Sequence, residues 1–188
     1  MNCTTEFEGS FTFNKPLNTD QIAYLKKFSK TRRMKRNPNL IKTKANSLRE
    51  KVGLPLGEDA EFYISGKGPF GQNPTKDVVN KNIPPSNQPG FWCQWEPSDD
   101  GSELKWDEGE KFYNYTKWLI YMLEKFFIPW GYVLNGEVKY EGERSNNIGV
   151  IIINNNVYLQ ECEHNEDEEI IGNKPLLILR EIKSNKLE

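Results

Sequence analysis

The sequence has few of the residues that build metal sites or nucleophilic centres. Its 188 residues include one histidine, His164, and three widely separated cysteines, Cys3, Cys93 and Cys162. Zinc needs several converging Cys or His ligands, and a disulfide framework normally uses an even set of cysteines. We therefore expect reduced thiols, no metal and no cofactor. No pattern indicates a serine or cysteine nucleophile.

Long hydrophobic runs and an excess of charge are also absent. A membrane-spanning helix needs about 20 apolar residues, and no run approaches that length. The first ten residues contain Glu6 and Glu8 and lack the apolar core of a signal peptide. The formal net charge of −2 favours neither nucleic acid nor membrane. We expect a cytoplasmic protein, and the length favours a single domain, residues 1–188.

Alternating apolar and polar residues predict strands that are mostly antiparallel. The predicted strands are 7–13, 61–65, 91–96, 103–106, 130–140, 149–153, 157–160 and 176–182. Asp99, Asp100 and Gly101 predict a tight turn between the third and the fourth of these.

Two amphipathic stretches predict helices over residues 19–34 and 107–128, and a short helix is expected at 46–52. Each long stretch opens with the spacing of a capping box, in which a side chain at the first position and one three residues later satisfy each other's backbone N–H groups. The two pairs are Asn18 with Gln21 and Asp107 with Glu110.

The order strand, helix, long loop, two strands, helix, strand predicts an α+β fold with a ferredoxin-like split βαβ core. We expect a mostly antiparallel sheet, both amphipathic helices on one face, and extra C-terminal strands. Residues 66–90 hold four glycines and five prolines. They predict a long ordered loop that covers part of the other sheet face. Residues 163–188 are read as an acidic extension.

Aromatic residues supply the main candidates for a binding surface. If Phe91 and Trp95 face the core, Trp92 and Gln94 face the other way, and exposed tryptophans are enriched where partners dock. The alternative is that the long loop buries Trp92. The predicted partner-binding residues, from loop and hairpin together, are Lys67, Phe70, Gln72, Trp92 and Gln94.

Basic residues near the end of the first predicted helix suggest a second surface. Arg32, Arg33 and Arg36 would contact phosphate if the protein bound nucleic acid. The simpler explanation is that cations near a helix C-terminus are stabilised by the helix dipole. Nucleic-acid binding is therefore an alternative that we do not favour.

A nucleotide or small-molecule site is the other alternative. Gly66, Gly68 and Gly71 match the spacing of a dinucleotide-binding loop, but no helix is predicted to follow, and Pro69 removes a backbone donor. Such a protein, enzyme or not, would use a pocket between the loop and the sheet, with this glycine turn and Glu137 as its polar groups.

Four segments resemble an uncharacterised family of small proteins encoded by bacteriophages, prophages and diverse bacteria. The segments are Asp20–Leu25, Gln88–Trp95, Trp106–Tyr115 and Pro129–Glu137, and the likeness spans roughly residues 7–159. The resemblance implies no established activity. By analogy it implies a role in host takeover or anti-defence within a bacterial cell. Together with the missing catalytic sets, it leads us to expect a non-enzymatic interaction protein with a protein partner.

Overall fold

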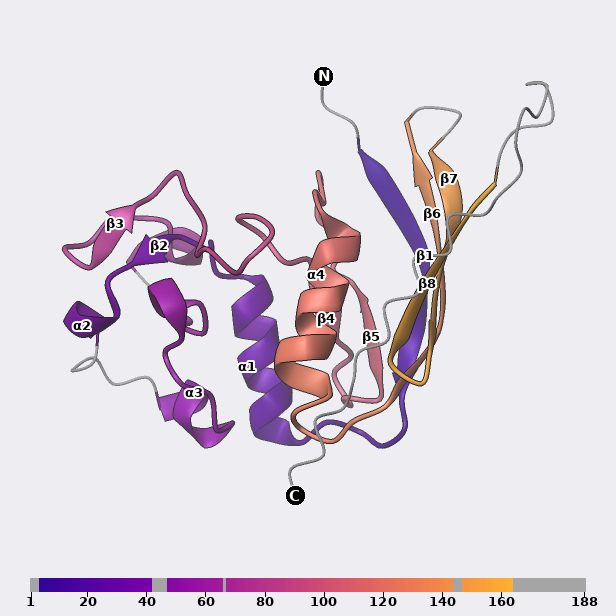
Figure 1. Cartoon of the computed structure of the whole chain (residues 1–188), viewed down its shortest axis with the longest axis horizontal. Helices are drawn as coiled ribbons and strands as arrows, with labels where there is room; N and C mark the ends of the chain where they lie inside the picture. The colour runs from indigo at the N-terminus through magenta and orange to yellow at the C-terminus, as the bar shows by residue number, and fades with distance from the viewer. Residues whose placement is uncertain (1–3, 42–46, 66, 144–146, 164–188) are drawn as a thin grey trace.

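The computed structural model describes residues 4–41, 47–65, 67–143 and 147–163 (Figure 1). Its centre is a six-stranded sheet in the order β4-β5-β1-β6-β7-β8, with antiparallel pairing throughout. The predicted α+β class and antiparallel sheet are confirmed. The strands are β1 (Thr5–Phe13), β4 (Trp95–Pro97), β5 (Glu103–Trp106), β6 (Leu134–Gly142), β7 (Ile148–Asn154) and β8 (Val157–Glu163).

Helices α1 (Thr19–Ser29) and α4 (Tyr115–Met122) cover one face of this sheet, as predicted (Figure 1). A π-helical turn, η3 (Leu123–Phe127), continues α4. The two helices meet through Phe28 and Trp118, whose ring centroids are 6.0 Å apart. Many of the buried core residues are large aromatic side chains.

An insertion between α1 and β4 lies on the side of the helices away from the sheet (Figure 1). The expectation that the 66–90 loop covers the second sheet face is therefore wrong. Phe62 of the insertion packs against Phe126, and the Tyr24 hydroxyl of α1 donates to the Phe62 carbonyl. The insertion's elements are β2 (Lys35–Arg36), α2 (Pro38–Ile41), α3 (Ser47–Lys51), η1 (Glu58–Ala60), η2 (Pro69–Gly71) and β3 (Val78–Asn80).

Helix α1 starts with the predicted capping box but ends at Ser29, five residues earlier than expected. Side-chain hydroxyls close the last turn, since Ser29 and Thr31 donate to the carbonyls of Lys26 and Lys27. The following backbone then bonds to the insertion instead of continuing the helix, with the Arg33 N–H donating to the Phe91 carbonyl. The basic residues 32–36 are therefore not a helix terminus.

The second helix begins at Tyr115, and the predicted capping box at its start is wrong. The Asp107 carboxylate accepts from the Gly109 N–H instead. Positive φ angles at Glu108, Lys111 and Asn114 prevent a helix from forming before residue 115.

Other boundaries differ in both directions. No strand forms at 61–65, and the paired strands begin at Trp95 instead of 91 and at Leu134 instead of 130. The short helix near 46–52 and the hairpin of β7 and β8 are confirmed. The predicted strand 176–182 lies outside the described residues. None of the helices in the described ranges has the length and apolar character that crossing a membrane requires.

The capping box gives a test of the fold. Asn18→Ala removes the side-chain oxygen that accepts from the Gln21 N–H at 2.9 Å, so we expect the free energy of unfolding to fall by about 1 kcal/mol. Asn18→Asp keeps an acceptor oxygen and should stay close to the wild type. Urea denaturation of the three proteins measures the difference, and equal losses in both variants would contradict the role of the cap.

Candidate functional site

Four side chains of the insertion form an aromatic–cationic surface where the backbone just after α1 bonds to the carbonyls of Phe70 and Phe91. They are Arg32, Phe70, Phe91 and Trp92. The Phe70 and Trp92 rings contact edge to face, with centroids 6.0 Å apart. The Arg32 guanidinium lies 4.4 Å from the Phe91 ring centroid, a cation–π distance. The structure thus brings the predicted loop residue Phe70 against the predicted hairpin residue Trp92.

Phe70 is held out into solvent by a strained backbone. Its φ of 55° lies in the left-handed region, which costs a residue other than glycine of order 1–3 kcal/mol. The ring is nevertheless 56% exposed, so its burial recovers little of that cost. Gly68, just before η2, also has positive φ, and a Cβ there would collide with the Asn73 side chain. The turn therefore combines a required glycine at position 68 with a strained backbone at the exposed Phe70.

A buried ion pair holds this turn from beneath. Arg36 Nη1 lies 2.7 Å from Asp77 Oδ2, and the two side chains are only 3% and 2% exposed. Arg36 Nη2 also reaches the Gly71 carbonyl at 3.4 Å. Thr75 donates a further bond to Asp77 at 2.6 Å. Arg36 was predicted to contact phosphate, but its buried guanidinium is already paired with Asp77 and supports the turn.

Arg33 is also buried, at 2% exposure. Its Nη2 donates to the carbonyls of Glu61 and Tyr63 at 2.6 and 2.8 Å, and its Nε donates to Gln88 Oε1 at 3.1 Å. Burial lowers the pKa of the guanidinium below its ordinary value. Of the three arginines predicted to meet phosphate, only Arg32 is partly exposed.

The same network continues to α4. The Tyr121 hydroxyl donates to Glu61 Oε2 at 2.8 Å and accepts from Gln88 Nε2 at 3.0 Å. Gln88 Nε2 also donates to the Glu61 carbonyl at 2.7 Å. Burial, followed by the nearby Glu61 carboxylate, raises the pKa of Tyr121 far above its usual value, so the phenol stays neutral. Sequence reasoning missed this network because its members share no spacing along the chain.

The remaining predicted binding residues fall in two groups. Lys67 and Gln72 are exposed on either side of η2, next to the aromatic–cationic surface in sequence. Gln94 is buried and belongs to the packing around β5, where its Nε2 donates to the Glu110 carbonyl at 2.9 Å and its Oε1 accepts from Trp106 Nε1 at 3.1 Å. The expectation that Gln94 shares an exposed face with Trp92 is wrong, because β4 begins only at Trp95.

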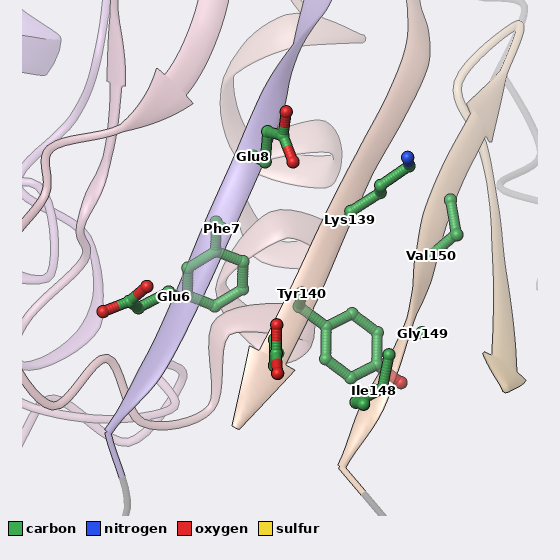
Figure 2. Close-up of a pocket in the computed structure, with 9 residues that line it drawn as sticks. Glu6, Phe7, Glu8, Lys139, Tyr140, Ile148, Gly149 and Val150 are labelled. Carbon is green, nitrogen blue, oxygen red and sulfur yellow. The ribbon is translucent and has the colours of Figure 1, made fainter. Parts of the chain in front are cut away.

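A shallow pocket of about 270 Å³ spans β1, β6 and β7 (Figure 2). In the β1–β6 register Glu8 lies opposite Lys139, and Glu6 lies opposite Glu141. All four of these residues are exposed. The charged side chains of this pocket therefore lie in solvent on the strand surface.

Among the described residues, the two polar groups predicted to line a pocket between the loop and the sheet lie on different parts of the fold. Glu137 lies on β6, opposite Ser10 and Ile152 in the sheet. Gly68 and Gly71 belong to the insertion, which lies on the side of the helices away from the sheet (Figure 1). The two proposed polar elements are therefore separated.

Cys93 is inert as a nucleophile in this environment. It is completely buried, and this burial raises its pKa to about 12. Within the described part of the chain, no group of three His, Cys, Asp or Glu side chains is placed to hold a metal ion. Cys3 and His164 lie outside the described residues.

Comparisons with family models, with curated proteins and with solved structures find no match for this chain. The function must therefore be argued from the site itself.

The buried network predicts a specific loss of stability. Tyr121→Phe deletes the donor to the Glu61 carboxylate and the acceptor for Gln88, and leaving buried polar groups unpaired costs about 1–3 kcal/mol. Tyr113 is 55% exposed, so Tyr113→Phe removes the same hydroxyl from the surface and should change stability by less than about 0.5 kcal/mol. Chemical denaturation compares the pair, and similar small effects would show that the network contributes little.

Thiol chemistry tests the burial of Cys93. In a Cys3→Ser, Cys162→Ser background, we expect Cys93 to resist a thiol reagent at pH 8, because below a pKa of about 12 the thiolate is scarce and the sulfur is covered. Denaturant should restore rapid modification. Fast labelling of the native protein would contradict the buried placement.

Proposed function

We propose that this chain is a non-enzymatic binding protein that captures an acidic segment of a protein partner on the aromatic–cationic surface. The observation that carries the proposal is Phe70, an exposed ring held in a strained left-handed conformation beside Trp92. Strained residues of this kind persist where the surrounding structure imposes them, and they cluster at binding sites. Aromatic and Arg side chains are also the residues that most often anchor protein interfaces.

The charge around this surface supports an acidic partner. In residues 67–90 the charged side chains are Lys67, Lys76, Lys81 and Asp77. Asp77 is neutralised by Arg36 in the interior, so the charge that this segment presents to solvent is positive. The whole chain has a net charge of −2, which makes this local excess distinctive. A carboxylate of the partner would meet Arg32, Lys67 or Lys81 while an apolar side chain packs on Phe70.

Nucleic acid is a poorer match for this surface. Nucleic-acid binding draws its affinity from many phosphate contacts, often about 6–10 for a duplex site. Arg33 and Arg36 are buried and hydrogen-bonded within the protein. Few exposed cations then remain beside the aromatic rings.

The scaffold under this surface is proposed to be ferredoxin-like. The chain order β1-α1-β4-β5-α4-β6 and the spatial order β4-β5-β1-β6 support that proposal. In this arrangement β7 and β8 extend one edge, and the connection after α1 carries the insertion. The fold does not specify an activity, so the assignment rests on the surface. By the resemblance to phage-encoded proteins, the partner would be a bacterial host protein.

Paired substitutions test partner capture. A Phe70→Ala, Trp92→Ala variant should lose partner proteins that the wild type retains in quantitative affinity purification from a nuclease-treated bacterial lysate. Val150→Ala, on β7 beyond both helices, should retain them. Retention should also weaken as salt rises, because the surface charges are solvent-exposed. Equal capture by all three proteins would overturn the proposal, and so would capture that disappears when nuclease is added.

Thermal unfolding of the same variants separates binding from folding. Phe70 is exposed and Trp92 is half-buried, so the melting temperature of the double variant should stay near that of the wild type. A large fall would show that the two rings are part of the core and would assign the loss of capture to misfolding.

A further inference from the structure

A second recessed site lies between residues 86–89 of the insertion and the outward face of α4. It is an open cleft of about 440 Å³, within the size range of small-molecule sites, about 300–1,000 Å³. This α4 cleft shares no lining residue with the aromatic–cationic surface. Its lining residues are Ser86, Asn87, Gln88, Pro89, Lys117, Ile120, Tyr121, Glu124 and Lys125.

The helix wall of the cleft presents two lysines on one side. Lys117, Tyr121 and Lys125 follow one another at steps of four residues, which places them along one face of a helix. The π-helical turn begins at Leu123, whose carbonyl accepts from the Ile128 N–H at 3.0 Å. In a π-turn each residue rotates about the helix axis by less than the ~100° of an α-helix. Lys125 therefore lies closer to the Lys117 side of the helix than it would in a continuous α-helix. Such π-turns are rare overall, and those that do occur are often found at functional sites.

The charge and polarity of the cleft favour an anion that carries an apolar part. Lys117, Lys125 and Glu124 together give the lining a net charge of +1. Within the described residues neither lysine takes part in an ion pair. Ile120 and Pro89 add apolar surface on opposite walls.

The floor of the cleft is rigid because its polar groups are already paired. Tyr121 and Gln88 bond to each other and to Glu61, and Gln88 also accepts from Arg33. The floor that joins the two walls is therefore ordered before a ligand arrives, which lowers the entropic cost of binding. Only the Lys117 and Lys125 side chains at the rim would need to change conformation to meet a ligand.

We propose that the α4 cleft binds a small phosphate monoester, with the phosphate between Lys117 and Lys125 and the apolar group against Ile120 and Pro89. A phosphate dianion has the charge to meet two ammonium groups, and lysine binds phosphate as a point charge. This site is separate from partner capture, and neither proposal depends on the other.

Phenyl phosphate is the probe, since it carries only a phosphate and a ring. Titration into the ¹⁵N-labelled protein should shift the amide signals of residues 86–88, 90 and 117–125. Inorganic phosphate and phenol, which each lack one of the two features, should bind more weakly. Signals that move only elsewhere, or equal binding of inorganic phosphate and phenyl phosphate, would overturn the proposal.

Charge-matched variants locate the site. Lys117→Gln, Lys125→Gln should raise the dissociation constant at least about tenfold, since two charge-assisted contacts are lost. Lys105→Gln, Lys139→Gln removes the same charge from exposed positions of the sheet and should leave the constant within about twofold. Lys117→Arg, Lys125→Arg keeps both charges and should retain most of the affinity. Equal weakening in the first two variants would reduce the effect to net charge and overturn the assignment.

Discussion

The hydrogen bonds of the buried Arg33 guanidinium hold the separate parts of this molecule together. Arg33 follows shortly after the end of α1, and its guanidinium lies 4.3 Å from the Phe28 ring centroid. The guanidinium donates hydrogen bonds to Glu61, Tyr63 and Gln88, which come later in the insertion. Removing a charge from water costs several kcal/mol, and no carboxylate of a described residue lies within salt-bridge distance of it. Carbonyl and amide oxygens therefore stabilise the charge, which is possible only if the insertion is folded against the helices.

Both proposed sites depend on this arrangement. On one side, the Arg33 N–H donates to the Phe91 carbonyl at 2.8 Å, next to the rings of the aromatic–cationic surface. On the other, Gln88 carries the network to Tyr121 at the base of the α4 cleft. The insertion thus adds two surface sites, the aromatic–cationic surface and the α4 cleft, to the helix-covered sheet. Its irregular backbone is ordered by buried polar contacts and by a second small apolar cluster around Ile41, Ala60 and Tyr63.

The candidate site was predictable in part. The Gly/Pro-rich loop pointed to Phe70, and the even-numbered face of the predicted hairpin strand pointed to Trp92; these two rings do meet. Arg33 and Arg36 were predicted as surface cations because a cluster of basic residues usually lies in solvent. Their burial depends on Asp77 and Gln88, more than 40 residues away in the chain, and no local pattern reports such pairings.

The sequence by itself determined the features that rest on local periodicity and capping: the alternation of β1, the Asn18–Gln21 capping box, the apolar stripe of α4, and the β7–β8 hairpin. Interactions between residues a few positions apart are enough to specify each of these. Only the tertiary structure decided where α1 stops, that Phe112 is buried outside a helix, and that the long loop packs on helices instead of the sheet. Those outcomes depend on hydrogen bonds and packing between segments distant in the chain, whose energies appear only once the segments meet.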